Sequence, residues 1–159
     1  MVRQMLAAAV MGLGVLAACS PGQSATASAQ TPAPVEAARH PVSGLEVIDL
    51  TVDRGGKMLA FKVELAASAE AQARGLMFRN ALGDNEGMIF PSAAPEPRSF
   101  WMKNTPLSLD IIFIGPDGRI TNIAANTVPY SLDSVRSSGL ASAVLELSLI
   151  HISEPTRQA

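Results

Sequence analysis

The chain has few of the residues that most often form cross-links, bind metals or act as general bases. Among its 159 residues there are 1 cysteine and 2 histidines. Cys19 has no second cysteine to pair with, so an intrachain disulfide and a cysteine-based zinc site are excluded. His40 and His151 lie towards the two ends of the sequence, and we expect no histidine general base in the domain. We accordingly expect no metal site and no cofactor.

Basic residues are too scattered for a nucleic-acid-binding surface. The chain has 12 lysines and arginines against 14 aspartates and glutamates, which gives a formal net charge of -2. Proteins that bind nucleic acid concentrate positive charge on one face or along one helix. The sequence therefore predicts no nucleic-acid partner. Its length suffices for one sizeable hydrophobic core, and we expect a single domain and a monomer.

The first residues have the pattern of a bacterial lipoprotein signal. A basic residue precedes an uncharged apolar run at 5–18, which has the length of a signal-peptide core and is too short to span a bilayer. The run ends in LAAC at 16–19, which looks like a lipobox, where the cysteine is acylated and becomes the first mature residue. We interpret 1–18 as a signal peptide and Cys19 as the lipidation site; an ordinary secreted protein is the alternative.

The next segment has the composition of a tether. Residues 19–41 are rich in Ser, Ala, Pro, Gln and Thr and nearly lack large apolar side chains, so ordering them would cost more entropy than burial returns. We expect this segment to be disordered and dispensable for folding. The lipid on Cys19 would make the membrane a partner. Ser20, in place of aspartate, is the pattern of lipoproteins that reach the outer membrane and face the periplasm.

Alternating apolar residues predict strands from Val42 onwards. The clearest alternation runs from Met58 to Ala66, and a weaker one runs from Leu45 to Val52. Arg54 to Lys57 between them contains two glycines and predicts a hairpin turn. Ser68 has the chemistry of a helix N-cap and Gly75 that of a C-terminal stop, which predicts one short helix.

Further short strands follow the predicted helix. The same alternation and turn signals place them at 87–90, 98–104, 107–114, 119–125 and 144–147. Short strands with many turns and one helix indicate a mainly β domain. We expect residues 42–147 to form a single-domain β-sandwich or a partly closed barrel.

Several strings of this domain also resemble the motifs of one family. RGLMFR, EGMIF, FWMKNT, LDIIF and VLEL follow one another between residues 74 and 147. In this order they resemble the family called domain of unknown function 192. The resemblance implies a β-rich domain and carries no established reaction. Residues 148–159 depart from the family pattern, and we interpret them as a non-native tail.

Polar side chains interrupt the most strand-like apolar sequence, FWMKNTPLSLDIIF at 100–113. A buried aspartate in a strand needs a cation or backbone donors, and the nearby motifs supply arginine and lysine. We therefore predict a polar pocket for a ligand. Its candidate residues are Arg79, Glu86, Trp101, Lys103, Asn104 and Asp110.

Each candidate also has a purely structural interpretation. Asp110 fits a buried carboxylate satisfied by a nearby turn, and structural ion pairs perturb such groups as functional sites do. Arg79 and Glu86 can form an ion pair that closes the loop between them. Trp101 can be a core aromatic with its ring N–H satisfied, and Asn104 is a common turn residue.

Three hypotheses about function remain open from the residues alone. The first is a lipid-anchored periplasmic module that binds a small ligand or an envelope component. The second is a hydrolase or lyase acting on an envelope polymer, with Asp110 and Glu86 as acid and base. The third is that the polar residues only specify strand register. The sequence assigns no catalytic residue.

Overall fold

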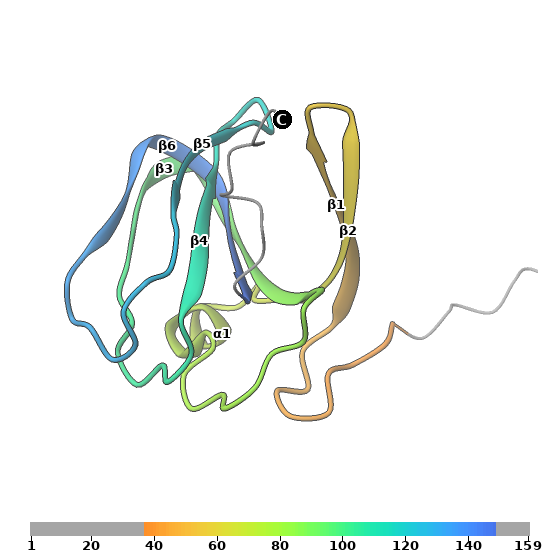
Figure 1. The fold of residues 1–159 in the computed structure, drawn as a ribbon, viewed down its shortest axis with the longest axis vertical. Helices are drawn as coiled ribbons and strands as arrows, with labels where there is room; N and C mark the ends of the chain where they lie inside the picture. The colour runs from red at the N-terminus through yellow and green to blue at the C-terminus, as the bar shows by residue number, and fades with distance from the viewer. Residues whose placement is uncertain (1–36, 149–159) are drawn as a thin grey trace, which may run out of the picture. The chain divides into compact units, whose positions relative to one another are not determined.

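The computed structural model describes residues 37–148. The predicted signal peptide, Cys19, the tether up to residue 36 and the tail from residue 149 lie outside the described residues. Six strands form one mixed sheet in the order β1-β2-β3-β6-β4-β5 (Figure 1). The elements are β1 Val47–Arg54, β2 Lys57–Leu65, α1 Ala69–Arg74, β3 Glu86–Phe100, β4 Leu109–Ile114, β5 Ile120–Ala124 and β6 Val135–Ser148. The predicted mainly β fold with one short helix is confirmed, and the sheet is not closed into a barrel.

The first hairpin forms where the alternation predicts it. β1 and β2 pair antiparallel, and the pairing runs up to Arg54 and Lys57. Gly55 and Gly56 between them have positive φ values of 60° and 90°. Only glycine adopts both angles without strain, and the resulting turn matches the twist of the strands. Asp53 Oδ1 accepts the Gly56 N–H at 2.7 Å and holds the turn.

The helix has the predicted ends. Ser68 Oγ accepts the Ala71 N–H at 3.1 Å, and the helix stops at Gly75, where φ is 50°. Gln72 Nε2 donates to the Pro91 carbonyl at 2.8 Å, which ties the helix to β3. Within residues 37–148 no helix is long and apolar enough to cross a membrane.

Strand β3 differs from the prediction. Two separate strands were expected at 87–90 and 98–104, whereas one strand runs from Glu86 to Phe100. Its pairing with β6 shifts between Pro91 and Glu96 and again after Pro97, because prolines lack the N–H that a regular ladder needs. The strand ends at Phe100, so the expected continuation to residue 104 is wrong.

Strand β6 is much longer than the expected segment 144–147. It lies between β3 and β4 and pairs antiparallel with both. Its residues 143–148 pair with β4, whereas before residue 143 only β3 pairs with it. Backbone hydrogen bonds to the long strand β3 therefore extend it through polar and small residues that show little apolar alternation.

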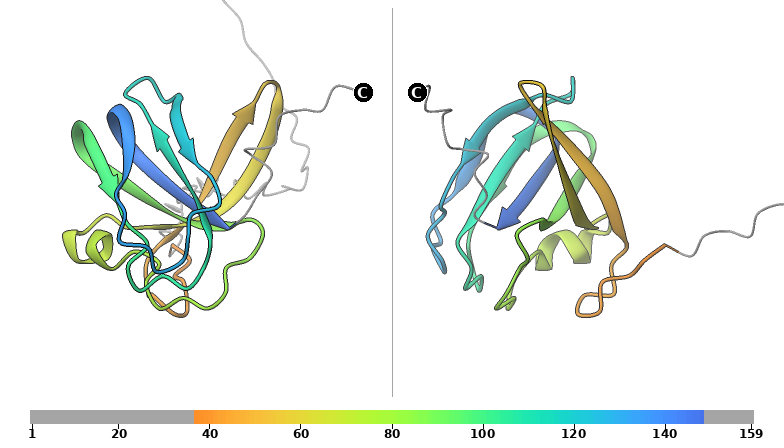
Figure 2. Two further views of the ribbon diagram at one scale, coloured as in Figure 1. Left: turned by 60° about the vertical axis from the view of Figure 1, so that its left-hand side comes forward. Right: turned by 45° about the vertical axis from the view of Figure 1, so that its right-hand side comes forward.

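The two faces of the sheet each carry a hydrophobic core. On one face α1 and the residues after it cover a cluster that includes Leu76, Met88, Phe90 and Ile111. On the other face the β1–β2 hairpin, which stands at an angle to β4 and β6 (Figure 2), encloses a cluster with Ile112 at its centre. Strand β4 is therefore buried on both sides, as its apolar run predicts.

The last residues of the predicted tether contact the domain. Arg39 forms an isolated antiparallel bridge with Glu46. The Val47 N–H donates to the Ala38 carbonyl at 2.7 Å, and the His40 N–H donates to the Leu45 carbonyl at 2.8 Å. The composition of this segment did not predict these contacts, because backbone groups make most of them and every residue type has the same backbone groups.

We therefore expect a chain that begins at Val42 to be less stable than one that begins at Ala37, in place of the equal stability expected from composition. The shorter chain loses the backbone hydrogen bonds of Ala38 and His40, and about 1–3 kcal/mol of unfolding free energy should go with them. Urea unfolding of the two chains measures this difference. A chain that begins at Ser20 is the control and should match the Ala37 chain. Equal stability of the Val42 and Ala37 chains would contradict the expectation.

Candidate functional site

Two glutamates lie in one row of side chains across the sheet. Strand register aligns Glu64 of β2, Met88 of β3, Glu146 of β6 and Ile111 of β4. All four face the side of the sheet that carries α1. Neighbouring strands are about 4.8 Å apart, which puts the two glutamate Cα atoms roughly 10 Å from each other with Met88 between them. Both glutamate side chains are buried.

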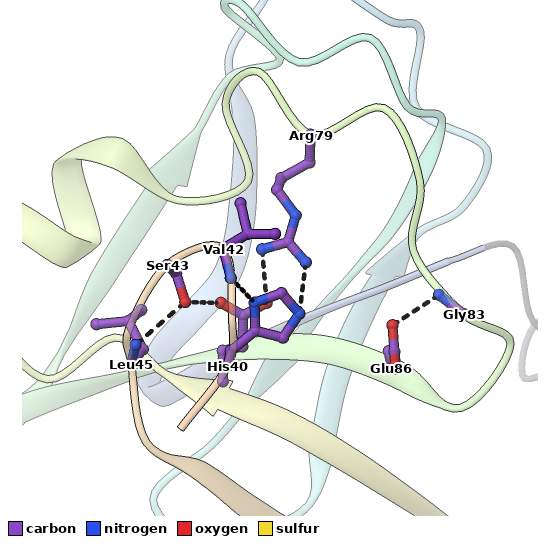
Figure 3. Close-up of polar contacts among 8 residues, drawn as sticks. His40, Val42, Ser43, Leu45, Arg79, Gly83 and Glu86 are labelled. Atoms are coloured by element: carbon purple, nitrogen blue, oxygen red, sulfur yellow. Dashed lines mark hydrogen bonds and ion pairs between the residues drawn. The ribbon is translucent and has the colours of Figure 1, made fainter. Parts of the chain in front are cut away.

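Glu64 is fully partnered. Arg79 Nη1 lies 2.8 Å from Glu64 Oε1, and the Ser43 hydroxyl donates to Glu64 Oε2. Arg79 Nη2 also donates to His40 Nε2 at 3.1 Å (Figure 3). The other ring nitrogen, Nδ1, lies 3.2 Å from the Val42 backbone nitrogen and 3.7 Å from Glu64 Oε1. The Glu64 cluster, defined as His40, Ser43, Glu64 and Arg79, therefore fastens the segment before β1 to the loop after α1.

This cluster corrects two expectations. Arg79 does not pair with Glu86, as the sequence suggested. Glu86 instead closes the loop by accepting the Gly83 N–H at 2.9 Å, apart from the Glu64 cluster in Figure 3. His40, which we placed outside the domain, lies against Arg79. The contacts of Arg79 have no local sequence signal, because Glu64 and His40 are 15 and 39 residues away from it in the chain.

Glu146 has the opposite environment. Its neighbours in the row, Met88 and Ile111, are apolar, and among residues 37–148 no group forms a hydrogen bond or ion pair with its carboxyl. Burial disfavours the charged form and raises the pKa of Glu146 to about 8. At neutral pH this side chain is mainly a neutral carboxylic acid that can donate a hydrogen bond.

A cavity of about 360 Å³ opens beside Glu146. Residues 72–77 of α1 and its following turn form one side, and the end of β3 with Trp101 and Thr105 forms another. Among residues 37–148, Glu146 is the only acidic residue that lines it, and Arg74 and Arg98 are the basic ones. The cavity therefore combines a neutral acid with positive charge, and a volume of this size admits a small ligand.

Arg98 is held rigidly at the cavity wall. Its Nη2 donates to Gln72 Oε1 at 3.1 Å, and its Nη1 donates to Ser92 Oγ at 2.9 Å. The guanidinium lies 5.4 Å from the centroid of the Phe100 ring. Nη1 also lies 3.3 Å from the exposed carboxylate of Glu96. These contacts fix a cation between α1 and β3 at the cavity wall.

Trp101 borders the same cavity and is half exposed, so it is not a core residue. Lys103 Nζ lies 5.2 Å from the centroid of its ring, within the range of a cation–π contact. An exposed indole with a cation on it leaves part of the aromatic surface available to a ligand.

Asn104 and Asp110 form hydrogen bonds with the backbone of loops. Asp110 is buried, and its Oδ1 accepts the Asn126 N–H at 2.9 Å. The sequence predicted either a cation or a backbone donor as the partner of this buried carboxylate. The structure shows a backbone donor, and no lysine or arginine of the described residues pairs with Asp110. Asn104 has a φ of 54°, and its carbonyl accepts the Phe78 N–H at 2.8 Å. Asparagine tolerates this left-handed conformation better than most residues.

Asp110 and Glu86 do not form an acid–base pair. Asp110 and Gly87 both pair with Leu147, so they share a row and a face of the sheet. Glu86 is the neighbour of Gly87 in the strand and points to the opposite face. The two carboxylates that the hydrolase hypothesis requires are therefore separated by the sheet.

Of the six predicted pocket residues, only Trp101 lines the cavity, and Lys103 lies over the Trp101 ring. The other four lie elsewhere. Glu146 was missing from the predicted pocket. Its signal was present, because a glutamate that alternates with Val144 falls on an apolar strand face. Within residues 37–148 no three His, Cys, Asp or Glu side chains are grouped closely enough to hold a metal ion.

Comparison with known proteins places the chain among uncharacterised relatives. The family model DUF192, described as uncharacterized ACR, matches residues 50–153. A protein of unknown function from Novosphingobium aromaticivorans DSM 12444 is 48% identical over 72% of this chain and 82% of its own, with a TM-score of 0.69. A protein from Sinorhizobium meliloti 1021, provisionally described as a transcription regulator, is 36% identical over 62% and 77%, with a TM-score of 0.60. No curated protein matches the sequence.

The raised pKa of Glu146 predicts that the domain loses stability as pH rises. The carboxyl titrates near its ordinary value of 4.5 when unfolded and near 8 when folded. Between these values the folded state holds a proton that the unfolded state has released, so the unfolding free energy falls across this window, by on the order of 3–5 kcal/mol. Below the window the loss is absent, and above it the loss is complete.

Glu146→Gln tests this assignment because glutamine has the same shape and does not titrate. The stability of the variant relative to the native chain should grow from about pH 5 to about pH 9, as measured by urea unfolding at each pH. A difference that stays constant over that range would show that Glu146 is ionised in the folded protein.

Proposed function

Because the chain belongs to the DUF192 family, which is uncharacterised, we propose its function from the cavity: it is a binding module for a small organic acid, anchored by lipid to the periplasmic face of the outer membrane. The observation that carries the proposal is the buried Glu146 carboxyl, which borders the cavity without a partner in the described part of the chain. No side-chain oxygen of the described residues is both fully buried and unpartnered, so the Glu146 carboxyl oxygens reach the cavity. A ligand in the cavity can accept the hydrogen bond that the protonated carboxyl donates.

The charges around the cavity favour an anionic ligand. Arg74 and Arg98 line it, and Glu146 is mainly neutral at pH 7. A carboxylate accepts hydrogen bonds from a guanidinium and from a protonated acid, and bonds to charged groups are the stronger ones. A cationic ligand would meet two like charges. The ring of Trp101 supports a flat or apolar body next to that carboxylate.

No observation favours the hydrolase alternative. Asp110 and Glu86 face opposite sides of the sheet and each has a backbone partner. Glu64 and Glu146 share a face, but the buried Met88 lies between them. Glu64 is also committed to Arg79. A glycosidic bond needs two carboxyl groups that flank one open space, whereas binding needs only the single acid.

Binding can be followed with Trp101, the only tryptophan of the chain. We expect small aromatic and aliphatic carboxylic acids to change its fluorescence, and their neutral amides to do so more weakly. Glu146→Leu should weaken acid binding by roughly tenfold or more, which corresponds to one lost hydrogen bond to a charged group. The variant should keep or gain stability, since leucine suits the apolar row.

Two further variants make the experiment specific. Glu146→Gln keeps a hydrogen-bond donor, so it should bind the acids. The affinity of the native chain should fall as pH rises past about 8, and that of the variant should not. Arg119→Gln removes an exposed charge in the turn between β4 and β5, outside the cavity, and should leave acid binding unchanged. The proposal fails if no acid binds, or if Glu146→Leu binds acids as the native chain does.

The lipid anchor has its own test. The lipobox-like sequence before Cys19 supports acylation, and two acyl chains are needed for stable anchoring. In bacteria, Cys19→Ala should abolish incorporation of a fatty-acid probe and move the protein from the membrane fraction to the soluble fraction. Ser20→Ala is the matched control and should remain labelled. Unchanged labelling of Cys19→Ala would show that the anchor is wrong.

A further inference from the structure

Exposed apolar side chains gather at one end of the sheet. Among residues 37–148, nine large hydrophobic residues are exposed. Three of them, Met58, Ile120 and Leu140, are spread over strands. The other six lie in loops and form what we call the loop face: Val42, Phe78, Trp101, Val128, Tyr130 and Leu132.

The loops that carry these side chains hydrogen-bond to one another. The Phe78 N–H donates to the Asn104 carbonyl at 2.8 Å, and the Tyr130 N–H donates to the Thr105 carbonyl at 3.1 Å. Val42 and Phe78 border a common cavity. Figure 1 shows these loops at the end of the sheet where α1 lies, opposite the β1–β2 and β4–β5 turns. The loop face is therefore one surface built from four segments.

Two aromatic residues of this face have costly backbone conformations. Phe78 has a φ of 63° and Tyr130 a φ of 61°, in the left-handed region that bulky residues avoid. The hydrogen bonds to Asn104 and Thr105 hold both, and the two side chains are more than 60% exposed. Strain that serves no packing in the domain is typical of a binding surface.

We propose that the loop face docks on a lipid surface. Tryptophan and tyrosine favour the interface between headgroups and acyl chains, and Phe78, Val128 and Leu132 supply the apolar surface that would enter it. The exposed charges of these loops include Lys103, Asp84 and Asp133, so the loop face has no excess of positive charge. Apolar contact rather than charge therefore drives the docking, and it should depend little on salt.

The position at which the N-terminal segment joins the domain supports a lipid surface as the partner of the loop face. His40 contacts Arg79 in the loop that also carries Phe78, so the segment that leads back to Cys19 joins the domain at the loop face. Fully extended, residues 19–36 span at most roughly 60 Å. An acylated Cys19 would thus hold the loop face within reach of the bilayer, where a weak contact suffices.

The test uses the unlipidated chain from Ser20, which keeps every residue of both cores. It is mixed with vesicles of phosphatidylethanolamine and phosphatidylglycerol, some of them brominated in the acyl chains. Docking should shift Trp101 emission to the blue, and the brominated lipids should quench it. Leu132→Ser and Tyr130→Asn should each weaken partitioning by about tenfold. Asparagine tolerates the left-handed backbone at position 130.

Leu140→Ser is the matched control, since Leu140 is exposed on β6, outside the loop face; its partitioning should stay within about twofold of the native value. The absence of quenching, or equal losses in Leu132→Ser and Leu140→Ser, would overturn the proposal. So would failure to bind vesicles together with dimerisation that Leu132→Ser abolishes, since the face would then belong to a second copy. Acid binding in the cavity is a separate property, and neither result decides the other.

Discussion

The register of β6 between β3 and β4 is the constraint on which the site depends. It aligns Glu146 with Met88 and Ile111, and the alternation of the strand turns the carboxyl toward α1. A slip of one residue would place Leu145 or Leu147 on that face and remove them from the second core. The hydrophobic clusters on both faces therefore hold the acid in place, although neither cluster gains from it.

The two glutamates of this row show two ways in which a protein accommodates a buried carboxyl. Glu64 lies against Arg79 and the Ser43 hydroxyl, and these contacts join segments far apart in sequence. Glu146 has no such partner in the described residues, and burial keeps it protonated. The first arrangement specifies the fold. The second leaves a donor available for a ligand.

Trp101 connects the cavity with the loop face. The strand β3 ends at Phe100, so the next residue leaves the sheet and its ring stays half exposed between the two surfaces. An organic acid with an apolar body resembles a lipid fragment in its chemistry, and the cavity borders the surface that we assign to the bilayer. A ligand that partitions into the membrane would reach the cavity without crossing open water.

Local chemistry is what the sequence by itself determined. Alternation and turn residues located the first hairpin, the capping residues located α1, and the apolar run of β4 predicted a strand buried on both faces. The strings from RGLMFR to VLEL also identified the family.

Contacts between distant segments were decided only by the tertiary structure. From the sequence, Arg79 could pair with any of several nearby acidic residues. Only the folded structure shows that its partner is Glu64. Six candidate residues looked like one pocket because they are close in sequence, but alternation sends Asp110 and Glu86 to opposite faces. Strand register gives Glu146 its apolar neighbours, Met88 and Ile111. The burial that raises its pKa exists only in the folded chain.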